Sequence, residues 1–345
     1  MTRVCVTGGN GFLGSAVVAR LLEHPEISSV LSLDIREPAP GRRLDGVQYA
    51  LADVCSPDVG RLLAEHRIDT VVHLAAIVNP GKDTTREQEF AVDVTGSRNV
   101  LAACVEAGVK HVVISSSGAA YGYHPDNPPW LRENDPLRGN DEFAYSHHKR
   151  LVEEELARCR QEHPELKQTI FRIGTILGER VRNQITALFD APRLLRVAGS
   201  ESPFVFAWDT DVADAMVRAV VTGRTGIFNV AGDGALTVRE IASLLGRGTL
   251  TVPGPVLAAA LWLGHRLRLT VHGPEQLRFL RYRPVLDNTA LKQDFGFTPT
   301  YTSREAFLAF RAARDAAEHP GPARTARAGQ QRAEEHRRRT TNAQK

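Results

Sequence analysis

The chain has 345 residues, of which 42% are hydrophobic and 24% are charged, enough for a sizeable core or for a large domain with a smaller one. No apolar stretch approaches the ~20 residues of a membrane span, and the net charge of +3 leaves no basic surface for nucleic acid outside residues 318–345. The four cysteines lack metal-site spacing and no secretory leader opens the chain, so we expect no metal, no membrane or nucleic-acid partner, and a cytoplasmic protein.

Short β-type runs alternate with helical patterns through the first half of the chain. The expected strands are 3–7, 30–34, 47–50, 70–74, 112–115 and 169–172, and the helical patterns cover 12–24, 57–66, 85–108 and 144–162. Such alternation predicts an α/β fold with a Rossmann-like, doubly wound parallel sheet that helices cover on both faces. We assign residues 1–175 to this domain.

The second half of the chain is more fragmentary. Elements are expected at 183–196, 209–222, 237–246, 256–268, 274–282 and 303–317, and 226–230 is a strand that can rejoin the sheet. Residues 176–317 are therefore predicted to form a substrate-binding lobe, partly interleaved with the sheet. Its apolar run 256–264 is interpreted as a buried or pocket-lining helix. Residues 318–345 carry a net charge of +4 and few apolar side chains, which predicts a disordered basic tail.

The first strand ends in a glycine-rich turn that leads directly into an apolar helical pattern. Gly8 permits the tight turn, Gly11 lets the backbone approach a pyrophosphate, and Gly14 lets the helix lie close to the strand. Twenty residues beyond Gly14, Asp34 closes the second strand, where a carboxylate can accept hydrogen bonds from a ribose. The pattern predicts a dinucleotide site.

A second group of polar residues follows later in the chain. Tyr145 and Lys149 are four apart on a predicted helix, so they share one face, and the ammonium can stabilise a phenolate for general acid–base chemistry. The strand before them ends in hydroxyl residues, 115–117, at the sheet edge where the glycine turn also lies. These hydroxyls are candidates for binding a substrate alcohol or carbonyl.

Together these motifs resemble the extended short-chain dehydrogenase/reductase family, also called the NAD-dependent epimerase/dehydratase family. The resemblance covers residues 3 to about 310 and rests on TGGNGFLG at 7–14, Asp34, Asp53-Val54, HLAA at 73–76, SSSGAAYG at 115–122, Tyr145 with Lys149, and Phe171-Arg172. It implies an NAD(P)-binding domain in which Tyr145 is the acid–base, Lys149 orients the ribose and supports the tyrosine, and Ser117 polarises the substrate.

The resemblance also implies a set of cofactor contacts. These are Gly8, Asn10, Gly11, Phe12, Leu13, Gly14, Asp34, Ile35, Arg36, Asp53, Val54, Leu74, Ala75, Ala76, Ser115, Tyr145, Lys149 and Arg172. Asp34 favours NAD, because a carboxylate repels a 2′-phosphate. Arg36 would attract that phosphate, which keeps NADP as the alternative.

Departures from the family pattern bear on the reaction. Family dehydratases place two acids directly after the catalytic hydroxyl residue, where this chain has Gly118 and Ala119, so dehydration is not expected. Phenylalanine stands at 204 and tryptophan at 208, where nucleotide-sugar epimerases have arginine and histidine, which suggests a less charged ligand. Ser117, Asn183, Phe204 and Trp208 are the candidate substrate contacts. At 93 an aspartate replaces the more usual asparagine, which puts a helix-positioning contact in doubt.

Three functions follow from these residues. The leading hypothesis is an NAD(P)-dependent oxidoreductase that transfers hydride at a secondary alcohol or ketone carbon of a small molecule. The second is a nucleotide-sugar epimerase that oxidises its substrate transiently, and the third is an NAD(P)-sensing regulatory protein without turnover. Family members often dimerise through the helices that correspond to 85–108 and 144–162, so the resemblance also implies a homodimer.

Overall fold

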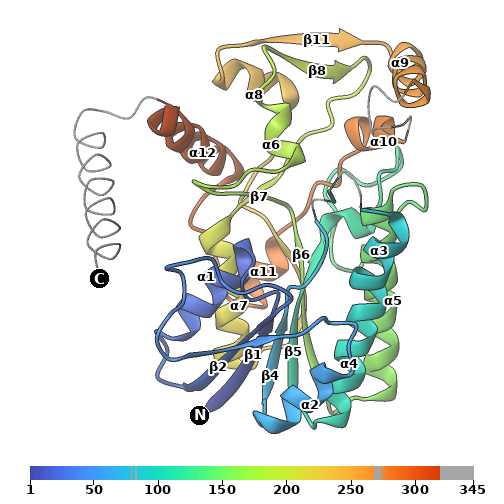
Figure 1. The fold of residues 1–345 in the computed structure, drawn as a ribbon. Coiled ribbons are helices and arrows are strands. Elements are labelled where there is room, and N and C mark those ends of the chain that lie inside the picture. Colours follow the sequence, from blue (N-terminus) through green and yellow to red (C-terminus); the bar gives the residue numbers. More distant parts are fainter. Residues whose placement is uncertain (79, 82–83, 268–272, 274, 319–345) are drawn as a thin grey trace, which may run out of the picture.

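A seven-stranded parallel sheet forms the centre of the molecule (Figure 1). The computed structural model describes residues 1–78, 80–81, 84–267, 273 and 275–318. In chain order the strands are β1 (Thr2–Thr7), β2 (Ile27–Asp34), β3 (Val47–Leu51), β4 (Thr70–His73), β5 (His111–Ser117), β6 (Lys167–Ile173) and β10 (Gly226–Val230). They lie in the order β3-β2-β1-β4-β5-β6-β10, and each neighbouring pair is parallel. The predicted doubly wound sheet is confirmed, and 226–230 does rejoin it.

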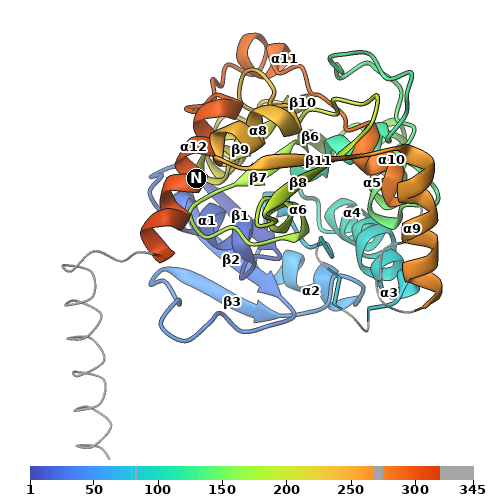
Figure 2. The same cartoon turned by 90° about the horizontal axis from the view of Figure 1, so that it is seen from above.

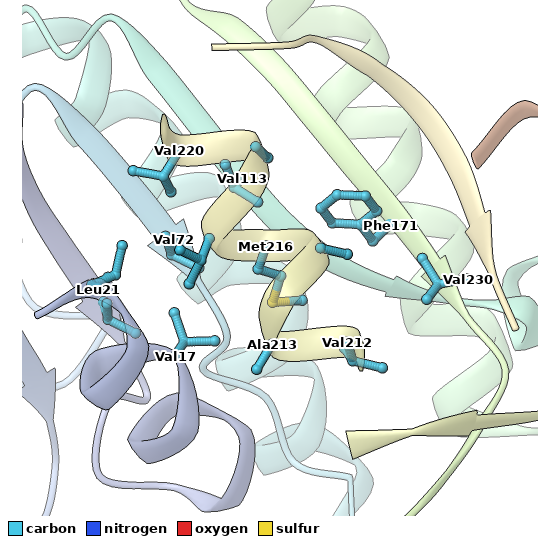
Figure 3. Packing of buried hydrophobic residues seen from close by; sticks show 14 of the residues in the cluster. Val17, Leu21, Val72, Val113, Phe171, Val212, Ala213, Met216, Val220 and Val230 are labelled. Carbon is cyan, nitrogen blue, oxygen red and sulfur yellow. The ribbon is translucent and has the colours of Figure 1, made fainter. Parts of the chain in front are cut away.

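Helices α1 (Phe12–Leu21) and α7 (Asp209–Thr222) cover one face of the sheet. Figure 3 shows Met216 of α7 among side chains from α1 and from the central strands, including Val17, Val72 and Phe171. All four are fully buried. Two elements that follow residue 175 in the sequence therefore belong with the sheet: β10 is one of its edge strands, and α7 covers one of its faces.

The opposite face is covered by α2 (Asp58–Glu65), α4 (Gly96–Glu106) and α5 (Ala144–Glu162) (Figure 1). The helix predicted over 85–108 is not continuous. It consists of α3 (Arg86–Phe90), a π-helical turn η1 (Ala91–Thr95) and α4. A wider turn of this kind is rare and is frequently found at functional sites.

The lobe lies above the carboxyl ends of the strands in Figure 1. Its elements are β7 (Thr175–Leu177), α6 (Gln184–Leu188), β8 (Arg193–Val197), β9 (Phe206–Trp208), α8 (Val238–Leu244), β11 (Gly248–Val252), α9 (Gly254–Arg266), α10 (Gln276–Arg281) and α12 (Ser303–Glu318). A short helix, α11 (Thr289–Gln293), packs beside β10 instead. The strands of the lobe form two parallel pairs, β7 with β9 and β8 with β11, around an aromatic core.

The helix predicted at 256–264 as buried or pocket-lining is not buried, and a pocket-lining role stays a prediction. Helix α9 is present, but Val256 is 57% and Trp262 56% exposed, and only Gly254 and Leu257 of the helix are buried. Figures 1 and 2 place α9 at the outer edge of the lobe. No helix in the described part of the chain has the length and apolar character to cross a membrane. The predicted disordered tail lies outside the described residues, apart from Glu318.

A buried ion pair ties α5 to β6. Both side chains are at most 4% exposed, and the Arg172 Nη2 lies 2.7 Å from Glu153 Oε2. The Arg172 Nη1 also donates to the Tyr121 hydroxyl and to the Glu133 carbonyl, each at 2.8 Å, and Ser116 Oγ donates to Glu153 Oε1 at 2.5 Å. Burial alone would lower the pKa of Arg172, but the hydrogen bonds and charge of Glu153 raise it.

We expect Glu153→Ala to destabilise the fold by about 3–5 kcal/mol, because it leaves Arg172 buried without its counter-charge. The free energy of unfolding in urea measures the effect. Glu154→Ala is the matched control, since that carboxylate is 58% exposed and its removal should change stability by less than about 0.5 kcal/mol. Equal losses in the two variants would show that the pair does not stabilise this fold.

Candidate active site

The glycine turn lies directly against the loop that follows β4. Gly8 has a φ of +67°, and a Cβ on it would lie 2.9 Å from the backbone nitrogen of Ala75. At the start of α1, a Cβ on Gly14 would lie 2.1 Å from the carbonyl oxygen of Gly8. Both positions therefore require glycine, the first for its backbone conformation as well as for space. The predicted roles of these two glycines in the turn and in helix–strand packing match the geometry.

The same turn presents unused hydrogen-bond donors. Helix α1 has no side-chain cap, and within the described chain no acceptor bonds to the N–H groups of Phe12 and Leu13. Such free amides at a helix start bind anions. The turn therefore fits the pyrophosphate of a dinucleotide.

Asn10 fixes the turn to the end of β2. Its backbone N–H donates to Asp34 Oδ2 at 3.1 Å, its Nδ2 donates to the Arg36 carbonyl at 2.6 Å, and its Oδ1 accepts from Ser32 Oγ at 2.8 Å. The other Asp34 oxygen accepts the Arg36 N–H at 3.1 Å. The carboxylate is thus held at the strand end by two amides, in the position expected for a ribose contact.

The other predicted cofactor contacts lie at the ends of neighbouring strands. Ile35 is 62% exposed next to Asp34, and Asp53 is exposed after β3, whereas Val54 is buried against the Gly96 turn of α4. Leu74, Ala75 and Ala76 are half-buried after β4. The fold therefore brings these residues to one edge of the sheet.

Tyr145 and Lys149 lie on the first turns of α5, beside the end of β5. The Lys149 Nζ is 5.8 Å from the centre of the Tyr145 ring and donates to the Ser115 carbonyl at 3.0 Å. Lys149 is buried, whereas Tyr145 is half-buried. The ammonium is held by the backbone of β5 and faces the tyrosine, as the spacing predicts.

Two hydroxyl groups at this point have a hydrogen free for a ligand. Ser117 Oγ accepts the Ala119 N–H at 3.1 Å, which leaves its own O–H available. Among the described residues, none hydrogen-bonds to the Tyr145 hydroxyl. A substrate oxygen can therefore receive hydrogen bonds from both residues.

A chain of buried hydrogen bonds runs behind the site. Burial and, to a smaller extent, the charge of Lys149 together lower the pKa of His73 to about 3 against the opposing charge of Asp93, so the ring is neutral. Ser97 Oγ donates to the Asp93 carbonyl at 2.6 Å, so it accepts from His73 Nε2 at 2.9 Å. The Nδ1 of His73 then accepts from Thr7 Oγ1 at 2.7 Å. Only this tautomer gives each of the four residues a hydrogen-bond partner. The resulting chain of hydrogen bonds joins β1, which leads into the glycine turn, to η1.

The structure corrects several predicted contacts. Arg172 was placed among the cofactor residues by resemblance, but its side chain is buried and its nitrogens bond to Glu153, Tyr121 and Glu133. Asn183 uses its Oδ1 to cap α6, where it accepts from the Thr186 N–H at 2.8 Å. The Arg172 side chain is engaged in the fold, so we assign it a structural role. Asn183 uses only its Oδ1 and backbone in the cap, so a substrate contact through its Nδ2 stays a prediction.

The two aromatic candidates for substrate contact are core residues. Phe204 is 3% and Trp208 7% exposed, and both belong to the aromatic core of the lobe. Phe204 stacks on Phe206 with 5.6 Å between ring centres, and Trp208 packs against Tyr301 at 5.2 Å. Their apolar character reflects packing of the lobe and gives no information on the charge of a ligand.

No sequence motif pointed to Arg283, which is the unusual cation of the lobe. It is 9% exposed, and its guanidinium lies 3.9 Å from the centre of the Phe204 ring. Its Nη1 donates to the Ser202 carbonyl at 2.8 Å, and its buried Nε has no partner in the described chain. Ser202 adopts a φ of +35°, a strained value for a residue with a side chain.

The charge of Arg283 is not balanced by a carboxylate among the described residues. Burial lowers its pKa to about 9, so it is still charged at neutral pH, and Tyr123 is the neighbour that acts against this shift. Burial raises the pKa of the Tyr123 phenol, Tyr145 raises it further, and Arg283 lowers it. Tyr123 therefore lies within electrostatic reach of both Arg283 and the candidate acid–base. Among the described residues, no cluster of His, Cys, Asp and Glu could hold a metal ion.

Comparison with known proteins gives relatives along most of the chain. An uncharacterised protein of Mycobacterium tuberculosis is 27% identical over 311 residues, which cover 88% of this chain and 82% of the relative. A UDP-glucose 4-epimerase of Azospirillum brasilense is 28% identical over 275 residues, 70% of this chain and 76% of that protein.

Solved structures show the same fold. The UDP-glucose 4-epimerase of Thermus thermophilus in complex with NAD matches with a TM-score of 0.66 and 26% identity, over 90% of this chain and 99% of that one. The UDP-glucose 4-epimerase of Thermotoga maritima with UDP-glucose matches with a TM-score of 0.71 and 20% identity, over 92% of this chain and 100% of that one.

The model of the NAD dependent epimerase/dehydratase family matches residues 4–231, which include the glycine turn, Ser117, Tyr145 and Lys149. The chain therefore belongs to the NAD-dependent epimerase/dehydratase family.

Proposed function

We propose that the protein is an NAD-dependent enzyme that transfers hydride at a secondary alcohol carbon of a small molecule, with Tyr145 as the acid–base. The observation that carries this proposal is the position of Tyr145 and Lys149 at the sheet edge that also holds the glycine turn and Asp34. A dinucleotide that lies along such an edge has its pyrophosphate at the turn and its nicotinamide near β5. NAD supplies the hydride acceptor when it is bound.

Residues of the chain supply the proton transfer and the orientation. Tyr145 takes the proton of the substrate hydroxyl as the carbonyl forms, and the Lys149 ammonium beside its ring stabilises the phenolate needed for this step. Ser117 donates its free O–H to the substrate oxygen and fixes that oxygen next to Tyr145. The reverse transfer uses the same groups in the opposite protonation states.

A nucleotide-sugar epimerase is the more specific function that we favour. Relatives of 26–28% identity include UDP-glucose 4-epimerases, and Arg283 supplies an uncompensated buried cation in the lobe. Such a charge costs several kcal/mol to bury and is balanced when an anion binds. A diphosphate beside Arg283 would leave the sugar toward Tyr123 and Tyr145. In this cycle the hydride returns to the same carbon, and the enzyme acts as an isomerase.

Two further expectations stay predictions. The helices over 85–108 (α3, η1 and α4) and 144–162 (α5) are the proposed homodimer surface, and a cytoplasmic location is proposed from the scattered free thiols. Size-exclusion chromatography with light scattering tests the first.

We expect the purified protein with catalytic amounts of NAD to convert UDP-galactose into UDP-glucose without net change in NADH absorbance. Proton NMR of the sugar anomers measures the conversion. Net NADH formation with these sugars would support the broader oxidoreductase function and contradict the epimerase.

Tyr145→Phe should lower turnover by about 10²–10⁴-fold, because it removes the proton acceptor, while NAD affinity stays nearly unchanged. Turnover and calorimetric NAD binding are measured on the same preparation. Unchanged turnover in the variant would contradict the assigned role of Tyr145, whereas NAD binding without turnover in the wild type would favour an NAD-sensing protein.

Arg283→Met should weaken binding of UDP by about 10–100-fold, because a charge-assisted hydrogen bond is lost, and leave uridine binding unchanged. Arg278→Met is the matched control, since that exposed arginine pairs with Glu142. The urea midpoint of Arg283→Met should not fall, because the variant removes a buried charge without a counter-charge. Equal weakening of UDP and uridine would contradict a phosphate contact.

A further inference from the structure

A buried carboxylate–imidazole pair lies beside the proposed catalytic residues. Asp93 in η1 and His148 in α5 are 2% and 1% exposed, and Asp93 Oδ2 lies 3.2 Å from His148 Nδ1. The ring of Phe90 meets the imidazole edge-on, with 5.6 Å between centres. Neither Tyr145 nor Lys149 bonds to this pair, so the chemistry described above does not use it.

The pair joins two segments that the proposed site depends on. Asp93 Oδ1 accepts the Ile77 N–H at 2.8 Å, which holds the loop containing Ala75 and Ala76. His148 directly precedes Lys149 in α5. One carboxylate therefore connects the loop expected to line the cofactor with the helix that carries the ammonium. The helix-positioning contact that the sequence placed in doubt at 93 is present, with an added bond to α5.

The Asp93 backbone adds a third connection. Its carbonyl accepts from Ser97, which ends the hydrogen-bond chain that starts at Thr7 beside the glycine turn. Asp93 also lies within the π-helical turn η1, where the wider backbone departs from the helix on either side. The loop after β4 and helix α5 thus bond to Asp93 directly, and β1 is linked to it through His73 and Ser97.

Hydrogen bonding defines the tautomer of His148. A carboxylate accepts only, so His148 Nδ1 must donate to Asp93. The buried Nε2 has no partner in the described chain, and in the neutral ring it carries a lone pair instead of an unbonded N–H. The charged groups around the pair are Glu89 on α3 and Lys149 on α5, and the imidazoles near it are His147 on α5 and His73 on β4. Burial raises the pKa of Glu89, His148 lowers it, and Asp93 raises it.

We propose that Asp93 and His148 are positioning residues, whose hydrogen bond holds the Lys149 end of α5 against the loop after β4. The assignment rests on the proposed function, because it takes Lys149 and that loop as cofactor contacts. It is a feature of this chain, since the family more often has asparagine at 93. The positioning role requires a hydrogen-bond donor where His148 Nδ1 lies, and it does not require a side chain that titrates.

Substitutions at 148 separate the donor from the ring. His148→Ala removes the donor and should weaken NAD binding on the order of tenfold, whereas His148→Asn places an amide N–H where Nδ1 lies and should bind within a factor of about three of the wild type. His147→Asn is the matched control on the same helix, since that imidazole bonds to Asp141 instead. Calorimetric titration with NAD gives the affinities, and far-UV circular dichroism verifies folding.

Asp93→Asn extends the test to the partner residue. Its amide N–H would face the N–H of His148, or would force the other tautomer and leave a buried Nε2–H without a partner, and either should weaken NAD binding on the order of tenfold. The double variant Asp93→Asn with His148→Asn restores a matched donor and acceptor. Recovery in the double variant supports the proposal. Wild-type NAD affinity in His148→Ala, or equal losses in His148→Ala and His148→Asn, would overturn it.

Turnover of UDP-galactose gives a second readout for the same variants. Misplacement of Lys149 should lower kcat and leave KM for the sugar nearly unchanged, and His148→Asn should recover kcat. A rise in KM with unchanged kcat would contradict the positioning role. If UDP-galactose is not a substrate, the epimerase proposal fails, and the NAD affinities still test the Asp93–His148 pair.

Discussion

The close approach of the glycine turn to the loop after β4 is the constraint on which the site depends. Strands β1 and β4 are adjacent and in register, with Thr7 opposite His73, so their following segments leave the sheet side by side. A Cβ on Gly8 would overlap the backbone of Ala75, and glycine removes that obstacle. The anion cradle, the buried Thr7–His73 bond and the loop held by Asp93 all follow from this contact.

Local sequence patterns predict the fold where the structure is determined by local spacing. The limits of α5 and α7 coincide with the predicted 144–162 and 209–222, because an apolar face with a 3.6-residue period defines each helix. The pairs β7–β9 and β8–β11 were not predicted, since their partners are distant in the sequence. The exposure of α9 was also missed, because an apolar run does not reveal whether another element covers it.

The candidate site likewise contains residues that local motifs predict and residues that only the fold brings together. Gly8, Ser117, Tyr145 and Lys149 belong to short motifs, and each lies where its motif predicts. The remaining residues meet only through the fold. His148 contacts Asp93, 55 residues away, and Arg283 contacts Ser202, 81 residues away, so no spacing along the chain indicates either pair.

Two buried arginines show how the lobe differs from the sheet domain. The guanidinium of Arg172 is matched by Glu153, and its bonds connect α5, β6 and the loop near Glu133. Arg283 has two aromatic rings and one serine around it, and no carboxylate among the described residues balances its charge. Phenylalanine at 204 had suggested a less charged ligand, but that ring is the surface on which Arg283 lies. The lobe therefore does carry a buried positive charge, which comes from another part of the sequence, and the proposed anionic substrate group would balance it.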